Sequence, residues 1–138
     1  MIRSKTSLKL IAVLSFTIFL SACRERTYHN PYEVYKRWAG SDPSSDVEVI
    51  HGKYWESAHW SKEYILFIEM KASKGWVEEF AKQNKLVKDS TTDQISGVPD
   101  WFNPTKEYLR FRRENDMYGS RYYFNLKSDK VFIFEAQL

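Results

Sequence analysis

The sequence predicts an α+β domain in which an antiparallel sheet of about five strands packs against one amphipathic helix, with a short helix at its N-terminal end. Two patterns lead to this fold class. Apolar side chains alternate with polar ones in several short segments, as in strands, and recur at helical spacing in one longer segment. Hydrophobic residues make up 43% of the chain and aromatic residues 17%, which is enough to fill a core.

The short helix is expected to begin at Asn30. Asn30 can cap a helix, Pro31 is tolerated at the first helical position, and Glu33 occupies the place of a capping-box carboxylate. The glycine and proline within residues 40–43 are expected to end this helix. Ser73 is expected to cap the amphipathic helix that packs on the sheet.

Strand-like composition marks five segments, residues 47–57, 62–72, 107–113, 121–126 and 130–136. A short polar connection separates the first two, which favours a hairpin, and short turns separate the last three, which favours a meander. Residues 88–100 have little periodicity and a turn-rich composition, so they are expected to form the longest loop. A loop of that length often carries a binding function.

Residues 1–22 have the three-part layout of a secretion signal. A short basic segment, residues 1–9, precedes an apolar stretch, residues 10–20, and the small residues Ser21 and Ala22 follow. The apolar stretch is too short to span the hydrocarbon layer of a bilayer, which requires about 20 residues in a helix. A permanent transmembrane anchor is therefore the weaker interpretation.

The four residues Leu20-Ser21-Ala22-Cys23 resemble the lipobox of bacterial lipoproteins. The resemblance implies cleavage between Ala22 and Cys23, a diacylglyceryl thioether on the Cys23 sulfur, and an acyl chain, typically palmitate, on the new amino terminus. Several acyl chains give stable membrane anchoring. An Asp after the lipidated Cys commonly retains Gram-negative lipoproteins at the inner membrane. Arg24 stands there in this chain, so the resemblance implies the periplasmic face of the outer membrane, if the host has two membranes.

Three parts of the chain are therefore expected. Residues 1–22 are the lipoprotein signal peptide, residues 23–29 are a lipid-anchored tether, and residues 30–138 are a single α+β domain. The tether is short, so the domain is expected to lie close to the bilayer.

The charge of the chain excludes one class of partner. The chain carries 21 Lys and Arg against 18 Asp and Glu, and the formal net charge of +3 resides in Arg3, Lys5 and Lys9 of the signal. The remainder is net neutral, so nucleic acid is not an expected partner. Cys23 is the only cysteine, so neither an internal disulfide nor an all-cysteine metal site can form. No cofactor is expected apart from the covalent lipid.

Aromatic side chains near turns are the first candidates for a binding surface. Trp55, Trp60 and Trp101 lie near predicted turns or loops, and Phe102 follows Trp101 at the end of the long loop. A flat amphipathic ring can stack on a sugar, contact a lipid headgroup or anchor a protein partner. The alternative is that these rings close the ends of a small core.

A stripe of tyrosine and arginine is the second candidate. In a strand, Tyr108, Arg110 and Arg112 share one face, where the guanidinium groups could hold carboxylate or phosphate groups of a ligand. Alternatively, nearby acidic side chains neutralise this Tyr/Arg stripe as cross-strand pairs; they are Glu107, Glu114, Asp116 and Glu135.

Neither a metal site nor an enzyme active site is expected. His51, Glu56 and His59 are weak candidates for metal ligands, because the spacing of the two histidines is not a known ligand signature. The chain also lacks the local motifs of serine hydrolases, phosphate-binding loops and zinc proteases.

The sequence therefore predicts a lipid-anchored envelope lipoprotein that acts as a binding module near the outer membrane. Its expected partner is a protein or a component of peptidoglycan, besides the membrane lipid reached through Cys23. One alternative is an immunity-type lipoprotein, held in the periplasm to inhibit a toxin. Another is a small hydrolase or metalloenzyme.

Overall fold

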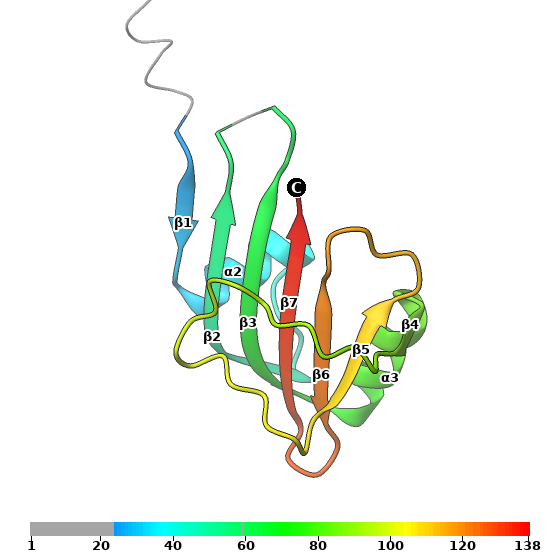
Figure 1. Ribbon diagram of the computed structural model, residues 1–138. Coiled ribbons are helices and arrows are strands. Elements are labelled where there is room, and N and C mark those ends of the chain that lie inside the picture. The colour runs from blue at the N-terminus through cyan, green and yellow to red at the C-terminus, as the bar shows by residue number, and fades with distance from the viewer. Residues whose placement is uncertain (1–23, 59) are drawn as a thin grey trace, which may run out of the picture.

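The computed structural model describes residues 24–58 and 60–138 (Figure 1). The signal segment, the cleavage-site residues Ala22 and Cys23, and His59 lie outside the described residues. Within the described part, the strands form one antiparallel sheet in the order β1-β2-β3-β7-β6-β5-β4. The elements are β1 (Arg26–Tyr28), α2 (Pro31–Ala39), β2 (Val47–Glu56), β3 (Tyr64–Ala72), α3 (Lys74–Gln83), β4 (Leu86–Lys88), β5 (Leu109–Arg113), β6 (Arg121–Asn125) and β7 (Lys130–Gln137).

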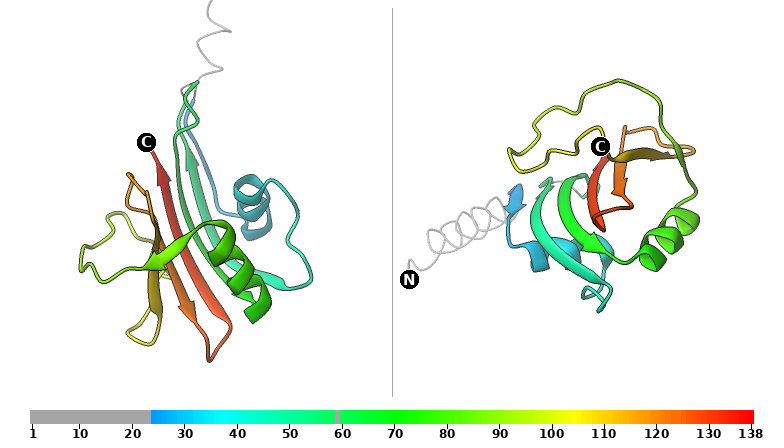
Figure 2. Two further views of the ribbon diagram at one scale, coloured as in Figure 1. Left: turned by 90° about the vertical axis from the view of Figure 1, so that its right-hand side faces the viewer. Right: turned by 90° about the horizontal axis from the view of Figure 1, so that it is seen from below.

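The predicted fold class is wrong. The sheet has seven strands rather than about five, and two helices rather than one cover the same face of it (Figure 2). The two missed strands, β1 and β4, have three residues each and lie at the edges of the sheet. A strand of that length is too short to show an alternating pattern, so only its pairing reveals it. β1 also extends the paired sheet back to Arg26, within the segment expected to be a tether.

The local units of the sheet confirm two sequence predictions. β2 and β3 pair as an antiparallel hairpin, and β5, β6 and β7 pair as a meander. The pairing of β3 with β7, from Tyr64↔Gln137 to Lys71↔Lys130, joins the hairpin to the meander. These segments are far apart in the sequence, so no local pattern predicts their pairing. It places β3 and β7 at the centre of the sheet, where both faces are covered.

Both helices begin where the sequence predicts. The Asn30 side chain accepts a hydrogen bond from the backbone N–H of Glu33 at 3.0 Å, and the Ser73 hydroxyl accepts one from the backbone N–H of Trp76 at 3.1 Å. α2 ends at Gly40, whose φ of 73° is a left-handed conformation that glycine adopts readily. In the described part of the chain, no helix is long and apolar enough to cross a membrane.

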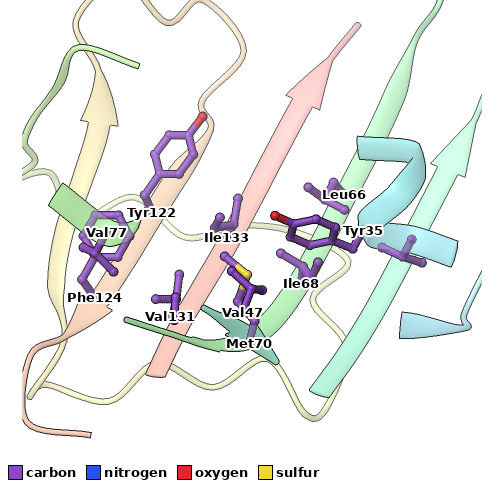
Figure 3. Packing of buried hydrophobic residues seen from close by; sticks show 12 residues of the cluster. Tyr35, Val47, Leu66, Ile68, Met70, Val77, Tyr122, Phe124, Val131 and Ile133 are labelled. Carbon is purple, nitrogen blue, oxygen red and sulfur yellow. The ribbon is translucent and has the colours of Figure 1, made fainter. Parts of the chain in front are cut away.

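The helices and the sheet enclose the main hydrophobic core (Figure 3). Successive side chains of a strand face opposite sides, so alternate residues of the central strands point toward the helices. The buried side chains of this core are Val34, Tyr35, Val47, Leu66, Ile68, Met70, Ala72, Val77, Tyr122, Phe124, Val131 and Ile133. Burial of each large apolar side chain stabilises the fold by roughly 1.5–3 kcal/mol.

Residues 89–108 cover the face of the sheet opposite the helices (Figures 1 and 2). Phe102 lies between Phe67 of β3 and Phe132 of β7, with ring centroids 5.2 Å and 5.3 Å apart. These three buried rings form a second core, around which partly buried apolar side chains gather. The long loop is therefore held against the sheet and closes this second core.

Gly52 of β2 lies directly beneath α2. A Cβ atom at this position would lie 2.8 Å from two side-chain carbons of the fully buried Val34. We predict that Gly52→Ala lowers the free energy of unfolding by about 1–3 kcal/mol, because α2 must move to relieve the overlap. Urea denaturation followed by circular dichroism measures this change.

Gly75→Ala is the matched control. Gly75 is exposed in α3, and a Cβ there would meet only the Ser73 hydroxyl at 3.9 Å. Alanine is the better helix former, so this variant is expected to be neutral or stabilising by up to about 1 kcal/mol. Equal unfolding midpoints for the two variants would contradict the close approach of α2 to β2.

Candidate functional site

The carboxylate of Glu135, on β7, is the centre of a buried hydrogen-bond cluster. Glu135 is 1% exposed. One of its oxygens accepts from the Trp38 indole N–H at 3.0 Å and from the Tyr64 hydroxyl at 2.9 Å. The other accepts from the Tyr122 hydroxyl at 2.7 Å and from the Arg113 guanidinium at 2.8 Å. The donors come from α2, β3, β6 and β5, so the carboxylate connects four elements to β7.

These contacts determine the protonation of the two tyrosines. Burial raises the pKa of Tyr64 and of Tyr122 above the ordinary value, and the negative charge of Glu135 raises it further. Both hydroxyls therefore remain donors at neutral pH. A carboxylate has about four acceptor positions, and all are used. Glu135 thus has no position left for a ligand, and it serves to hold the side chains of Trp38 and Arg113 in place.

A cleft of about 530 Å³ opens between α2 and α3 beside this cluster. Its volume lies within the range of small-molecule binding sites. The aromatic lining comes from both helices and from β3, namely Tyr35, Trp38, Tyr64, Trp76 and Phe80. The polar lining is Glu79, Gln83, Asn84, Arg113 and Glu135.

The aromatic rings give this α2–α3 cleft flat walls. The rings of Trp76 and Phe80 stack with centroids 4.9 Å apart and an interplanar angle of 9°. The Trp38 ring lies 5.8 Å from the Phe80 ring. All three rings are only partly buried and line the cleft. Such rings suit an apolar or amphipathic face of a ligand, such as that of a sugar ring.

Arg113 is the cationic group of the α2–α3 cleft. Its side chain is 40% exposed and lies 2.8 Å from the Glu135 carboxylate. The same nitrogen donates to the Asn84 side-chain oxygen at 3.3 Å. Glu135 balances the charge of Arg113, so Glu79 supplies the remaining charge of the lining. The cleft therefore offers directional hydrogen bonds with little net charge, which favours a polar ligand of low charge.

The structure places three of the predicted binding aromatics on the opposite face of the sheet. Phe102 is buried in the second core, and the Tyr108 ring packs edge-on against Phe132 with centroids 5.3 Å apart. The partly buried Trp101 ring stacks on the His51 ring at 5.1 Å. These contacts attach residues 89–108 to the sheet.

The Tyr/Arg stripe is paired within the protein. Arg110 contacts the carboxylates of Asp89 at 2.9 Å and Asp93 at 2.6 Å. Arg121 contacts the same two carboxylates at 2.7 Å and 2.8 Å. A hydrogen bond from Thr91, reinforced by the two guanidinium groups, lowers the pKa of Asp93 to about 2. The two aspartates belong to the segment that covers the sheet, and they differ from the acidic partners that the sequence suggested for Arg110.

The remaining predicted binding residues do not line the α2–α3 cleft. Arg112 donates to two backbone carbonyls at the end of β5, at 3.3 Å and 3.2 Å. The Trp55 indole donates to the Glu25 carboxylate at 3.3 Å. Trp60, in the turn between β2 and β3, is 99% exposed.

The weak metal-ligand candidates are not brought together in the described part of the chain. His51 Nδ1 lies 2.7 Å from a carboxylate oxygen of Glu69 on β3. Glu56 accepts a hydrogen bond from the Tyr28 hydroxyl at 3.0 Å, and His59 lies outside the described residues. Among residues 24–58 and 60–138, no three His, Cys, Asp or Glu side chains converge as a metal ion requires.

Sequence patterns identify none of the cleft residues Trp38, Trp76 and Arg113 as part of a site. One signal for the cluster was present. Val131, Ile133 and Glu135 alternate along the last strand, which places a carboxylate on the core-facing side. A carboxylate buried there requires several donors. Only the three-dimensional arrangement shows which side chains supply them.

Comparisons with known proteins found no match to this chain. No family model matches the chain, and neither the curated proteins nor the solved structures give a significant match.

We predict that Glu135→Gln lowers the free energy of unfolding by about 2–4 kcal/mol. The amide would bring its own N–H donors against the existing ones and would leave Arg113 without its counter-ion. Urea denaturation measures the loss. Glu79→Gln, on the exposed side of α3, is the control and should change stability by less than about 0.5 kcal/mol. Equal effects of the two substitutions would contradict the role of the buried carboxylate.

Proposed function

We propose that this chain is a lipid-anchored protein of the bacterial envelope whose folded domain binds a glycan component of the cell wall in the α2–α3 cleft. Two independent features support the two halves of this proposal. The lipobox-like residues Leu20-Ser21-Ala22-Cys23 support the anchor. The aromatic cleft beside the Glu135 cluster supports the binding role, and it is the observation that carries the proposal.

The preorganisation of the α2–α3 cleft favours binding. Trp38 and Arg113 are both fixed by the Glu135 carboxylate, at 3.0 Å and 2.8 Å. A ligand therefore meets side chains that are already ordered, and ordering them on binding costs little conformational entropy.

The chemistry of the lining favours a glycan. Sugar rings combine hydroxyl groups with faces of C–H bonds, and they bear little charge. The stacked rings of Trp76 and Phe80 can contact such a face, while Arg113, Asn84 and Gln83 can bind hydroxyl or amide groups. A peptidoglycan strand carries both kinds of group.

We predict that Cys23→Ala moves the chain from the membrane fraction to the soluble fraction. Cys23 is the only cysteine, so no other residue can receive the thioether. Fractionation with salt and alkaline washes measures the shift. In a host with two membranes, Arg24→Asp is expected to keep the anchored chain at the inner membrane. Retention of the Cys23→Ala chain in washed membranes would contradict the lipid anchor.

We predict that Ala39→Trp abolishes glycan binding by filling the α2–α3 cleft. Ala39 is exposed at the end of α2 and lines the cleft, so the larger side chain can enter it without displacing the core. Trp76→Ala, which removes one wall, is expected to weaken binding at least about tenfold. Isothermal titration of the detergent-solubilised chain with muramidase-released peptidoglycan fragments measures both effects.

Lys36→Trp is the matched control for the blocking substitution. Lys36 lies on the exposed side of the same helix, where it pairs with the exposed Asp42 at 3.1 Å. This variant should bind as the wild type does. Failure of the wild-type chain to bind any fragment, or equal binding by Ala39→Trp and Lys36→Trp, would overturn the glycan assignment. A protein captured by crosslinking in envelopes and lost in Ala39→Trp alone would instead identify a protein ligand.

A further inference from the structure

The register of β1 places two segments at one end of the sheet. β1 runs antiparallel to β2, with Arg26 opposite Glu56 and Tyr28 opposite Tyr54. The chain that precedes Arg26 and the chain that follows Glu56 therefore leave the sheet in the same direction. Figure 1 shows the start of β1 and the turn between β2 and β3 at the same end of the molecule.

The turn between β2 and β3 is ordered at its base and displays Trp60. The Ser57 backbone N–H donates to the Glu63 carbonyl at 3.0 Å, and the Ser57 hydroxyl donates to the Ser61 carbonyl at 3.2 Å. Trp60 is 99% exposed, the largest fraction of any large hydrophobic side chain in the described part of the chain. Tryptophan side chains are highly buried on average in folded proteins, so an almost fully exposed indole is unusual.

Chain length limits the distance between Trp60 and an anchor at Cys23. Cys23 precedes Arg26 by three residues, which span at most about 11 Å at 3.6 Å per residue. Trp60 follows Glu56 by four residues, which span at most about 14 Å. Because both segments start from one paired position and leave in one direction, the indole can lie at the level of the acylated cysteine.

We infer that Trp60 inserts into the interface of the bilayer that carries the anchor, and that it forms a second contact between the domain and the membrane. This inference rests on the lipid anchor of the proposed function. Indole rings favour the boundary between headgroups and acyl chains, because the ring is apolar and its N–H remains hydrogen-bonded. With the anchor and Trp60 both engaged, the domain cannot rotate freely about a single tether.

The contact with the membrane depends on the indole ring of Trp60 and not on electrostatic attraction. Arg24, Arg26 and Lys62 lie at this end of the molecule, but so do Glu25, Glu56 and Glu63. The opposite charges leave no basic patch that would attract anionic headgroups. The contact of Trp60 is therefore expected to be insensitive to salt.

Quenching of tryptophan fluorescence tests this inference. The full lipidated chain, purified from membranes, is reconstituted into vesicles of phosphatidylethanolamine and phosphatidylglycerol, with and without bromine atoms on the acyl chains. Bromine quenches only an indole that reaches the acyl region. The wild type should be quenched, and Trp60→Ala should lose this quenching. Trp101→Ala is the control and should retain it, because the partly buried Trp101 ring stacks on the His51 ring, away from the turn between β2 and β3.

The outcomes separate the anchor from the second contact. If the wild type floats with the vesicles, Cys23→Ala does not, and Trp60→Ala loses quenching, the inference is supported. If the wild type floats but Trp60→Ala is quenched as strongly as the wild type, the second contact is overturned while the anchor stands. If the wild type fails to float, the anchor is overturned and the second contact with it.

Discussion

The buried carboxylate of Glu135 is the constraint on which the arrangement of helices and strands depends. In a low-dielectric interior, a carboxylate that lacks donors costs several kcal/mol. Trp38, Tyr64, Tyr122 and Arg113 supply the donors from four elements, so none of these elements can shift alone without leaving the charge unsatisfied. The α2–α3 cleft lies beside this cluster, and three of its lining side chains, Trp38, Tyr64 and Arg113, are bonded to the carboxylate.

Local features of the fold were predictable because short segments determine them. The caps at Asn30 and Ser73 need only a side-chain oxygen beside the first helical turn. The hairpin and the meander follow from alternating apolar residues with short connections between them. The edge strands β1 and β4 were not predictable, because three residues carry no period. The central pairing of β3 with β7 depends on packing between distant parts of the chain.

The predicted and the observed candidate sites differ for a physical reason. The same aromatic residues serve binding surfaces and cores, and sequence alone does not show whether a second segment covers them. Residues 89–108 cover Phe102, and their aspartates Asp89 and Asp93 pair with Arg110. The cleft was missed because its lining comes from α2, α3, β3, β5 and β7. The binding pattern that the sequence shows in β5, Arg110 with Arg112, lies on the opposite face of the strand from the cleft residue Arg113. Trp60 is exposed in the polar turn where the sequence places it, although the sequence left open whether its ring closes the end of the core.

The central place of β7 determines when the sheet can be completed. β7 is the last strand in the sequence, but it lies between β3 and β6. Until it is available, the β2–β3 hairpin and the β5–β6 pair share no neighbour, and their apolar faces remain open. Pairing of such distant segments is slow, because loop-closure entropy is lost before the contacts form. If the proposed signal directs export, late completion of the sheet keeps the polypeptide unfolded. An unfolded chain can pass through a narrow translocation channel until β7 has passed.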